Sequence, residues 1–515
     1  MSDEGTRKTG LFRRAIAAWH NRLEPSQATT RPEDRVGFAR MLAYGIGGFV
    51  NNILAAAIGG MLIVLNLGLG MNPALVGLVG ALPRLTDALT DPVMGYISDH
   101  TRSRWGRRRP YIFVGAITSG IIYIALWWLP LGQSESFYYW WFLIGSIVFY
   151  LAYTVFATPW VAMGYELTPD FHERTRLMGV QNFIGQLAYL ISPWFLWFMT
   201  QKDWFDDQIE GAKWLAVIIG VVVIVLGILP ALFLRERFAQ TEGTAPAEAA
   251  EVAMPPKTTP PKMTPPKMTI WASIKDFGRG LKRTLSSGPF LKLGAATFLV
   301  FNGFILISSF QYYVIIYYVF GGDQEAGSEW AGYSGTVGAI STFIVIMIVT
   351  WLGTRIGKRQ AFFVAIGLSM VGYALKWFCY HPDLPWLLLV PAPFMAFGLG
   401  GLFTLMGSMI ADVVDVDELS TGERREGMYG SIFWWVVKLG MAAALAGGGL
   451  LLNATGFDVE AGGAQAERTI TLMRLCDAFI PVIASALAIW AVWSYPITEE
   501  AAGRVRAQLE ARRGA

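Results

Sequence analysis

The sequence predicts an all-α membrane protein with twelve membrane-spanning helices in two six-helix halves and both termini in the cytoplasm. Of its 515 residues, 54% are hydrophobic and 15% are charged, against about 25% charged residues in an average globular domain. Long apolar segments recur along the chain, and basic residues collect in alternate loops. This composition excludes a disordered chain, a collagen-like chain and an ordinary soluble enzyme.

Twelve apolar segments reach the length of about 20 residues that a spanning helix needs. These predicted spans are 40–67, 75–98, 110–131, 138–165, 177–200, 213–234, 289–319, 328–353, 360–379, 385–411, 428–453 and 471–494. Several are longer than the hydrocarbon layer requires, which predicts tilted helices or helices that extend beyond the bilayer.

The distribution of basic residues predicts the orientation. Thirty-four of the 41 Lys and Arg residues lie in the N-terminal segment, in alternate loops or in the C-terminal tail. The positive-inside rule places these segments in the cytoplasm. The basic residues assigned to the opposite side are Lys202, Lys213, Lys376, Arg468 and Arg474. No cleavable signal peptide is expected, because the first apolar run is long and follows a 40-residue basic segment.

Composition divides the chain into five parts. Residues 1–37 form a cytoplasmic amphipathic segment, either a helix on the inner membrane surface or a frayed tail. Residues 38–235 and 288–495 are the two six-helix halves. A Pro-rich cytoplasmic linker at 236–287 joins them and contains Pro-Pro-Lys three times, a composition that favours extended, solvated backbone. Residues 496–515 form a cytoplasmic tail.

An internal repeat supports the two halves. Residues 104–111 enter the third span and residues 355–362 enter the ninth, 251 residues later, with a shared basic-Gly-basic pattern. Both stretches occupy the loop between the second and third helix of their half. Six plus six helices related by a parallel repeat is the major facilitator architecture.

Two carboxylates lie inside the second predicted span. Asp87 and Asp91 are four residues apart and therefore share one helix face. Carboxylates within the membrane are costly and mark functional sites, and two so close repel each other. A Na⁺ ion, a proton or a basic side chain must balance them, and oxygen ligands suit a hard cation. The alternative is a buried structural network with Arg84 and Lys438.

Lys438 is predicted to be the one lysine deep inside an apolar span. It lies in the other half of the protein, and we expect it to approach Asp87 and Asp91 or a substrate at the midline. The alternative is that it snorkels towards an interface. In the last span, Arg474 and Asp477 are expected to form an i,i+3 ion pair.

Charged residues in two cytoplasmic loops predict gating contacts. Asp99, Arg104, Arg107 and Arg108 follow the second span, where arginines can cap helix carbonyls and meet anionic lipids. We expect them to latch the cytoplasmic side closed, with Arg424 and Arg425 in an acidic loop of the second half as the matching latch. The alternative is that the arginines only orient the chain.

Further polar and aromatic residues within the spans are candidates for a polyhydroxyl ligand. They are Asn51, Asn52, Thr154, Thr158, Gln181, Asn302 and Gln311, with Trp160, Phe403, Trp434 and Trp435 as stacking surfaces. The alternative for each aromatic residue is packing or interface anchoring. The four His and two Cys lack metal-ligand spacing, and no nucleophile–base constellation is visible. We therefore expect neither an enzyme nor a cofactor other than a coupling ion.

Three motifs, at residues 87–110, 158–176 and 411–429, resemble the signature of the glycoside–pentoside–hexuronide:cation symporters. The resemblance covers roughly residues 38–495. It implies a cation site for Na⁺ or H⁺ at Asp87 and Asp91, with Thr154 as a further ligand. It also implies that Arg84 and Lys438 belong to the substrate and cation region.

The resemblance departs from the family pattern at the sugar site. Asn52 and Gln181 replace an Asp and an Arg that recognise galactosides, and Trp160 lies beside the position of a stacking Trp. Phe403 matches a further aromatic position. These departures argue against melibiose and leave two alternatives, a different glycoside that hydrogen-bonds to Asn52 and Gln181, or a bulkier, less polar substrate.

The expected function is cation-coupled symport of a glycoside by alternating access. We expect a monomer in a bacterial inner membrane that binds a small molecule, a monovalent cation and lipid, but no nucleic acid. The first alternative is transport of a lipid-like or other amphiphilic substrate on the same fold. A non-transporting receptor is a second alternative, and a membrane enzyme is the weakest.

Overall fold

The computed structural model describes residues 34–168, 170–236, 284, 286–422 and 425–514, and every described element is helical. Ten helical segments in this part of the chain are long and apolar enough to cross a membrane. Most of the predicted N-terminal segment and of the Pro-rich linker, together with Arg424, lies outside the described residues.

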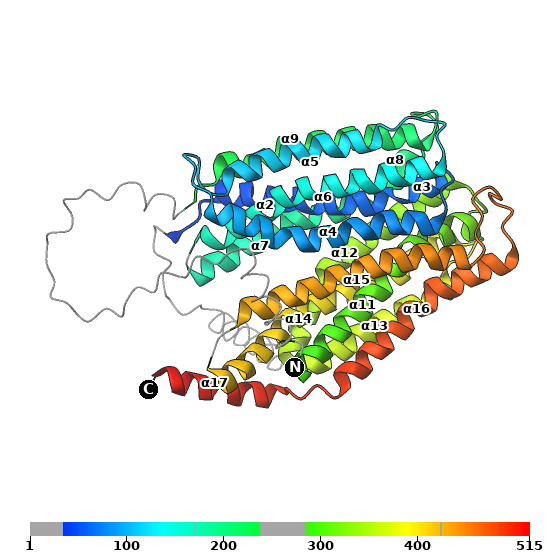
Figure 1. Cartoon of the computed structure of the whole chain (residues 1–515). Coiled ribbons are helices and arrows are strands. Elements are labelled where there is room, and N and C mark those ends of the chain that lie inside the picture. The colour runs from blue at the N-terminus through cyan, green and yellow to red at the C-terminus, as the bar shows by residue number, and fades with distance from the viewer. Residues whose placement is uncertain (1–33, 169, 237–283, 285, 423–424, 515) are drawn as a thin grey trace, which may run out of the picture.

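The first half is a bundle shown in blue to green in Figure 1. Its elements are α2 (Phe38–Met61), α3 (Ile63–Leu67), α4 (Pro73–His100), α5 (Arg109–Trp127), α6 (Glu135–Glu166), α7 (Phe171–Ile191), η2 (Ser192–Trp194), α8 (Phe195–Met199) and α9 (Gln208–Phe233). The break between α7 and α8 falls at Pro193, which lacks an N–H group for the helical hydrogen-bond ladder.

The second half is shown in green to red. Its elements are α11 (Gly288–Tyr313), η4 (Val314–Val319), α12 (Gln324–Ile356), α13 (Lys358–Cys379), η5 (Pro385–Leu389), α14 (Pro391–Thr421), α15 (Glu426–Ala454) and α16 (Glu467–Trp493). A last helix, α17 (Glu499–Gly514), packs on α14 at one end of this bundle (Figure 1).

Each predicted span overlaps a helix, and the boundaries differ where charged residues continue a helix beyond its apolar part. The clearest case is α14, which begins at Pro391 and runs through acidic residues to Thr421, whereas the span was expected at 385–411. Two further helices, α4 and α7, are long but more polar than these ten. In α4 the cause is the charge of Arg84, Asp87, Asp91 and Asp99.

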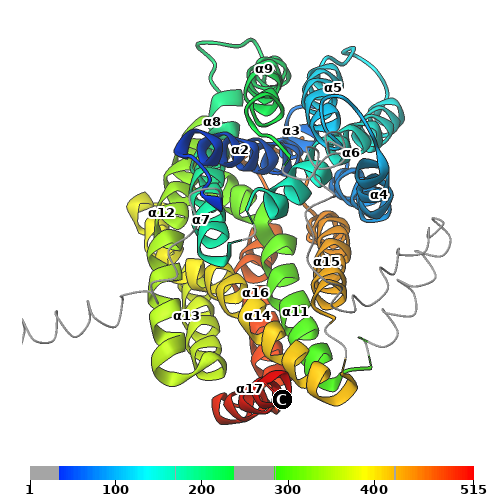
Figure 2. The same cartoon turned by 90° about the vertical axis from the view of Figure 1, so that its left-hand side faces the viewer.

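The two halves meet mainly along α4 with α15 and, more weakly, along α7 and η2 with α12 (Figure 2). The closest backbone approach lies near the start of α4 and the end of α15, where a side chain at Gly449 would overlap the carbonyl oxygen of Pro73. At the same end, the Tyr313 hydroxyl donates to Asn66 Oδ1 over 2.9 Å, and the Trp194 indole donates to Thr336 over 2.9 Å.

The buried apolar side chains follow the same division. One cluster fills the first half and continues into the end of the second half that carries Tyr313, Tyr317 and Phe457. A separate cluster around Phe362, Met406 and Tyr429 fills the opposite end of the second half. The halves are therefore packed together at the end opposite the loop that joins α4 to α5.

Candidate functional site

The acidic face of α4 lies at the boundary between the halves, because α4 packs on α6 on one side and on α15 on the other. Asp87 is buried and Asp91, one turn later, keeps 34% of its side chain exposed. Pro92 follows Asp91 and removes one hydrogen bond from the ladder of α4 at this level. Asp91 therefore lies at the solvent-accessible edge of the carboxylate pair, and Asp87 lies inside it.

Hydroxyl groups of α6 converge on the two carboxylates. Thr154 Oγ1 lies 3.1 Å from Asp87 Oδ1 and 3.2 Å from Asp91 Oδ1, and Thr158 donates to the same Asp91 oxygen over 3.2 Å. Thr90 Oγ1 lies 3.4 Å from Thr154 Oγ1. Because a hydroxyl carries one proton, Thr154 cannot donate to both carboxylates at once. A small patch of oxygen atoms from α4 and α6 results, of the type that hard cations prefer.

Lys438 of α15 contacts the other oxygen atoms of the same carboxylates. Its ammonium group lies 3.0 Å from Asp87 Oδ2 and hydrogen-bonds to Asp91 Oδ2. The structure thus places Lys438 where the sequence predicted it, as a bridge between the halves. The δ1 oxygens face Thr154 and the δ2 oxygens face Lys438, so a cation and Lys438 can share the pair or compete for it.

Polar side chains of the first half continue from this pair. The Arg84 guanidinium is buried over the ring of Tyr150, 4.7 Å from its centroid. Tyr153 donates to Asn51 Oδ1 over 2.8 Å, and Asn52 donates to the Gly185 carbonyl over 3.0 Å. These bonds join α2 to α6 and α7.

The other predicted substrate residues are divided between the core and exposed positions. Trp160 is buried, stacks on Tyr44 at 5.1 Å and donates to the Tyr44 carbonyl, so its ring packs α6 on α2. Gln181 is half-buried against Gly48 of α2. Phe403 stacks on Trp434 with ring centroids 5.9 Å apart, and both rings are exposed. Trp434 lies one turn of α15 before Lys438.

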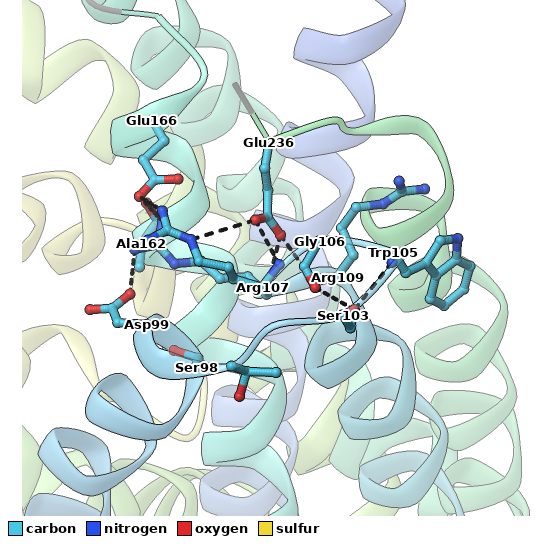
Figure 3. Close-up of polar contacts among 12 residues, drawn as sticks. Ser98, Asp99, Ser103, Trp105, Gly106, Arg107, Arg109, Ala162, Glu166 and Glu236 are labelled. Carbon is cyan, nitrogen blue, oxygen red and sulfur yellow. Dashed lines mark hydrogen bonds and ion pairs between the residues drawn. The ribbon is translucent and has the colours of Figure 1, made fainter. Parts of the chain in front are cut away.

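The predicted gating residues of the first half form a compact ionic cluster (Figure 3). Arg108 lies 2.6 Å from Asp99 Oδ1 and 2.8 Å from Glu166 Oε1, and Arg107 pairs with Glu166 at 2.8 Å. Arg104 is exposed. Asp99 belongs to α4, Glu166 to α6, and the two arginines directly precede α5, so the contacts hold the first half together. They do not bridge it to the second.

The matching loop of the second half has the same character. Arg425 pairs with Asp417 at 2.6 Å, and Lys358 pairs with Asp412 at 2.7 Å. Both pairs join elements of the second half. In this structure each charged loop pairs within its own half. Contacts between the two loops that latch the halves together stay a prediction for a state in which the end that carries them is closed.

Sequence reasoning missed Glu236, which follows α9. Its buried carboxylate accepts hydrogen bonds from the backbone N–H groups of Arg107, Arg108 and Arg109 at 2.7–3.2 Å (Figure 3). Gly106, at a φ of 107°, permits the approach, since a Cβ there would lie 2.7 Å from Glu236 Oε1. Glu236 therefore caps the positive end of α5. The sequence feature that could have indicated this contact is a glutamate close after the end of an apolar span.

Two expectations in the second half were wrong. Lys376, assigned to the outer loops, is buried in α13 and pairs with Asp477 of α16 at 2.5 Å, so Lys438 is not the one lysine deep in a span. Asp477 consequently does not pair with Arg474, which lies between the rings of Tyr318 and Trp377 and donates to the Trp377 carbonyl. The physical reason is that Asp477 pairs with the buried Lys376 of the neighbouring helix and not with the residue one turn earlier on its own helix.

The family described as MFS/sugar transport protein matches residues 43–499. An uncharacterised symporter of Synechocystis is 26% identical and aligns over 93% of this chain and 98% of its own. The isoprimeverose transporter of Lactiplantibacillus pentosus is 23% identical over 94% of both chains.

A more distant relative has a different named substrate. The sodium-dependent lysophosphatidylcholine symporter 1-A of Danio rerio is 22% identical over 89% of this chain and 86% of its own. Among solved structures, a bacterial homologue of the human lysosomal transporter Spinster, inward-facing and unoccupied, superposes with a TM-score of 0.63. It is 16% identical and covers 89% of this chain and 98% of its own.

Proposed function

The chain belongs to the MFS/sugar transport protein family, in agreement with its resemblance to glycoside–pentoside–hexuronide:cation symporters, and we propose that it couples a glycoside to Na⁺ or H⁺. As a member, it is a multi-pass membrane protein and a secondary active transporter of a small molecule. Its named relatives are transporters, which is why we assign no catalytic residues.

One observation carries the proposal of cation coupling. Asp87, Asp91 and Thr154 present converging oxygen atoms on α4 and α6, while Lys438 reaches the same carboxylates from the other half. A cation bound on the Thr154 side weakens the hold of Lys438 on the pair. Occupancy of the site therefore alters a contact between the halves, which is what alternating access requires.

The architecture completes this proposal. We count α4 and α7 as spans, which gives twelve, with the halves at 38–235 and 288–495 and the linker at 236–287. The positive-inside rule places the arginine-rich loops and both termini in the cytoplasm of a bacterial inner membrane. The outer end is then the packed end, so this is a cytoplasm-open state. We propose that the monomer is the working unit.

The residues proposed to contact the substrate are Asn52, Arg84, Gln181, Phe403 and Lys438. Phe403 with Trp434 offers an exposed aromatic face near Lys438, and the amides offer hydrogen bonds to hydroxyl groups. Trp160 acts indirectly, by fixing α6 against α2.

One alternative has its own support. A lipid-like or amphiphilic substrate would suit the exposed aromatic pair, and the sodium-dependent lysophosphatidylcholine symporters share this scaffold.

The test is thermal stabilisation of the purified carrier by a panel of glycosides, each with and without Na⁺ at fixed ionic strength. A ligand that binds the native state raises its stability. Stabilisation by a glycoside that increases with Na⁺ is the expected result. Stabilisation without a Na⁺ effect would assign H⁺ as the coupling ion. A Na⁺ effect without any glycoside effect would favour the amphiphile.

A further inference from the structure

A groove in the second half lies between α11 and α16, which pack side by side (Figure 1). Its volume is about 340 Å³. The residues that line it are Leu291, Lys292 and Ala295 of α11, Trp490, Ala491 and Trp493 of α16, and Ser494. These residues lie where α11 begins and α16 ends, at the end of the molecule that the positive-inside rule places in the cytoplasm. The groove is therefore at the level of the inner leaflet.

The apolar part of the groove belongs to a surface that faces the bilayer. The side chains of Trp490 and Trp493 are large and apolar, and the two residues are 76% and 65% exposed. Ile483 and Leu487 continue the exposed face of α16 towards the middle of the helix. Tryptophans of spanning helices collect at the headgroup level. A hollow in such a surface offers water few polar partners, so it suits an acyl chain.

Two positive charges lie at the polar end of the groove. Lys292 Nζ donates to the Ser494 carbonyl over 2.6 Å. Arg359, at the start of α13, donates to the Trp493 carbonyl over 2.5 Å and to the Tyr495 carbonyl over 3.5 Å. The two basic groups thus bind three successive carbonyls at the C-terminal end of α16, where a positive charge is favourable.

No carboxylate among the described residues neutralises these two charges. The recorded partners of Lys292 and Arg359 there are backbone carbonyls and, for Arg359, the ring of Phe363. Lys358, at the same end, pairs instead with Asp412. The bond to Ser494 uses one of the three donors of the Lys292 ammonium. Lys292 therefore keeps donors and an uncompensated charge beside an apolar groove, which capping of α16 alone does not explain.

We propose that this groove binds an anionic phospholipid of the inner leaflet, with an acyl chain along Ala295 and Trp490 and the phosphate on Lys292. Basic pockets between spanning helices on the cytoplasmic side recognise anionic headgroups. Arg359 raises the positive potential at the same place. The lipid is a component of the bilayer and is not transported, so the inference does not depend on the cation or the substrate proposed above.

The test uses the purified full-length carrier in micelles that contain dioleoyl phosphatidylglycerol or dioleoyl phosphatidylcholine, which share their acyl chains and differ in net charge. The unfolding temperature against lipid concentration gives an apparent affinity for each lipid. Phosphatidylglycerol is expected to bind about fivefold more tightly, the effect of one basic side chain near an anionic lipid. High salt should reduce the difference. Glycerol 3-phosphate, a phosphate without acyl chains, should not stabilise the carrier.

Variants assign the preference to the groove. Lys292→Gln should abolish the preference for phosphatidylglycerol, and Lys292→Arg should retain it. Arg355→Gln is the matched control, because it removes one exposed positive charge at the same end, over the ring of Trp351. It should leave the preference intact. Trp490→Ala changes the apolar part and keeps the cap on α16, so it should weaken the binding of both lipids. This variant decides alone if Lys292→Gln does not unfold cooperatively.

Three results would overturn the lipid site. The first is equal stabilisation of the wild-type protein by the two lipids. The second is a preference that survives in Lys292→Gln, or that Arg355→Gln lowers equally, because it would reflect the overall surface charge. The third is unchanged lipid binding in Trp490→Ala. Native mass spectrometry identifies the occupant, and retained phosphatidylglycerol is expected. A lipid-free dimer that Trp490→Ala dissociates would place a second copy of the chain on the groove instead.

Discussion

Lys438 holds the two halves together through charge. It contacts both carboxylates, one of them buried, from a helix of the opposite half. In the absence of a cation it is the positive group that makes the close approach of Asp87 and Asp91 tolerable. In the proposed mechanism a bound cation takes over part of this role, and Lys438 transmits the occupancy of the site to the second half.

Replacing Lys438 tests this role. Lys438→Met should destabilise the cation-free carrier, by somewhat less than the ~3–5 kcal/mol typical of a broken buried pair because Asp91 is partly exposed. Na⁺ should restore most of the loss. The measurement is the unfolding temperature against Na⁺ concentration. A variant as stable as wild type without Na⁺ would contradict the account.

The Lys376–Asp477 pair has no role in the proposed transport cycle. Both side chains are almost fully buried, between α13 and α16 of one half. Lys376→Met leaves a buried carboxylate unpaired and should cost about 3–5 kcal/mol. Adding Asp477→Leu should recover much of this loss. A double-mutant cycle from unfolding measurements checks it, and additive losses would show that the pair does not interact. The Na⁺ response should stay unchanged in the double variant.

Residue patterns predicted much of the side-chain cluster around Asp87 and Asp91 and few of the contacts made by the candidate substrate residues. The i,i+4 spacing placed Asp87 and Asp91 on one face, and the position of Lys438 in a span of the other half predicted that it approaches this pair or a substrate. No local pattern tells which neighbour a buried side chain meets. For Trp160 the sequence left open stacking on a ligand or packing, and the ring packs on Tyr44. Lys376 pairs with a residue 101 positions further along the chain.

At the scale of elements, α5 and α9 cap each other. Glu236, after α9, accepts from the first N–H groups of α5, and Arg109 of α5 donates to the Ala231 and Leu232 carbonyls at the end of α9. Each charge lies at the helix end that favours it. This reciprocal contact ties the start of the linker to the arginine cluster around Arg107 and Arg108.

Removing the Glu236 carboxylate should loosen the start of α5. Glu236→Ala leaves three backbone N–H groups without an acceptor and should cost about 1–2 kcal/mol, as other lost helix caps do. Hydrogen exchange of the amides of residues 107–112 is the measurement, with faster exchange expected there than in α6. Glu236→Gln, which keeps an acceptor oxygen, should have a smaller effect. Unchanged exchange in Glu236→Ala would remove Glu236 as the cap.

The lengths of the apolar segments predicted where the helices lie, but they did not predict where the helices end. Residues 412–418 continue α14 beyond its apolar part, and two of their carboxylates pair with basic residues outside the helix, Asp412 with Lys358 and Asp417 with Arg425. Pro193 predicts the break at Ser192–Trp194 from the local sequence. Its packing against Gly335 of α12 depends on the tertiary structure and has no local sequence pattern.

At the scale of the whole molecule, the halves are closed at one end by close backbone approach. Gly449 of α15 lies against Pro73 and Gly77 of α4, with no room for a side chain. Gly449→Trp should wedge this end apart and hold the carrier open to the outside. The expected result is substrate binding to right-side-out vesicles without uptake. Gly59→Trp is the control, because Gly59 of α2 faces open space, and it should transport normally. Normal uptake by Gly449→Trp would contradict closure at this contact.

The central claim is that Asp87 and Asp91 hold the coupling cation. The most direct test is the unfolding temperature of wild type, Asp91→Asn and Asp477→Asn against Na⁺ concentration, with choline keeping the ionic strength constant. We expect a saturable Na⁺ stabilisation in wild type and in Asp477→Asn, which removes a buried carboxylate remote from the site, and no such stabilisation in a folded Asp91→Asn. An undiminished Na⁺ stabilisation in Asp91→Asn would contradict it.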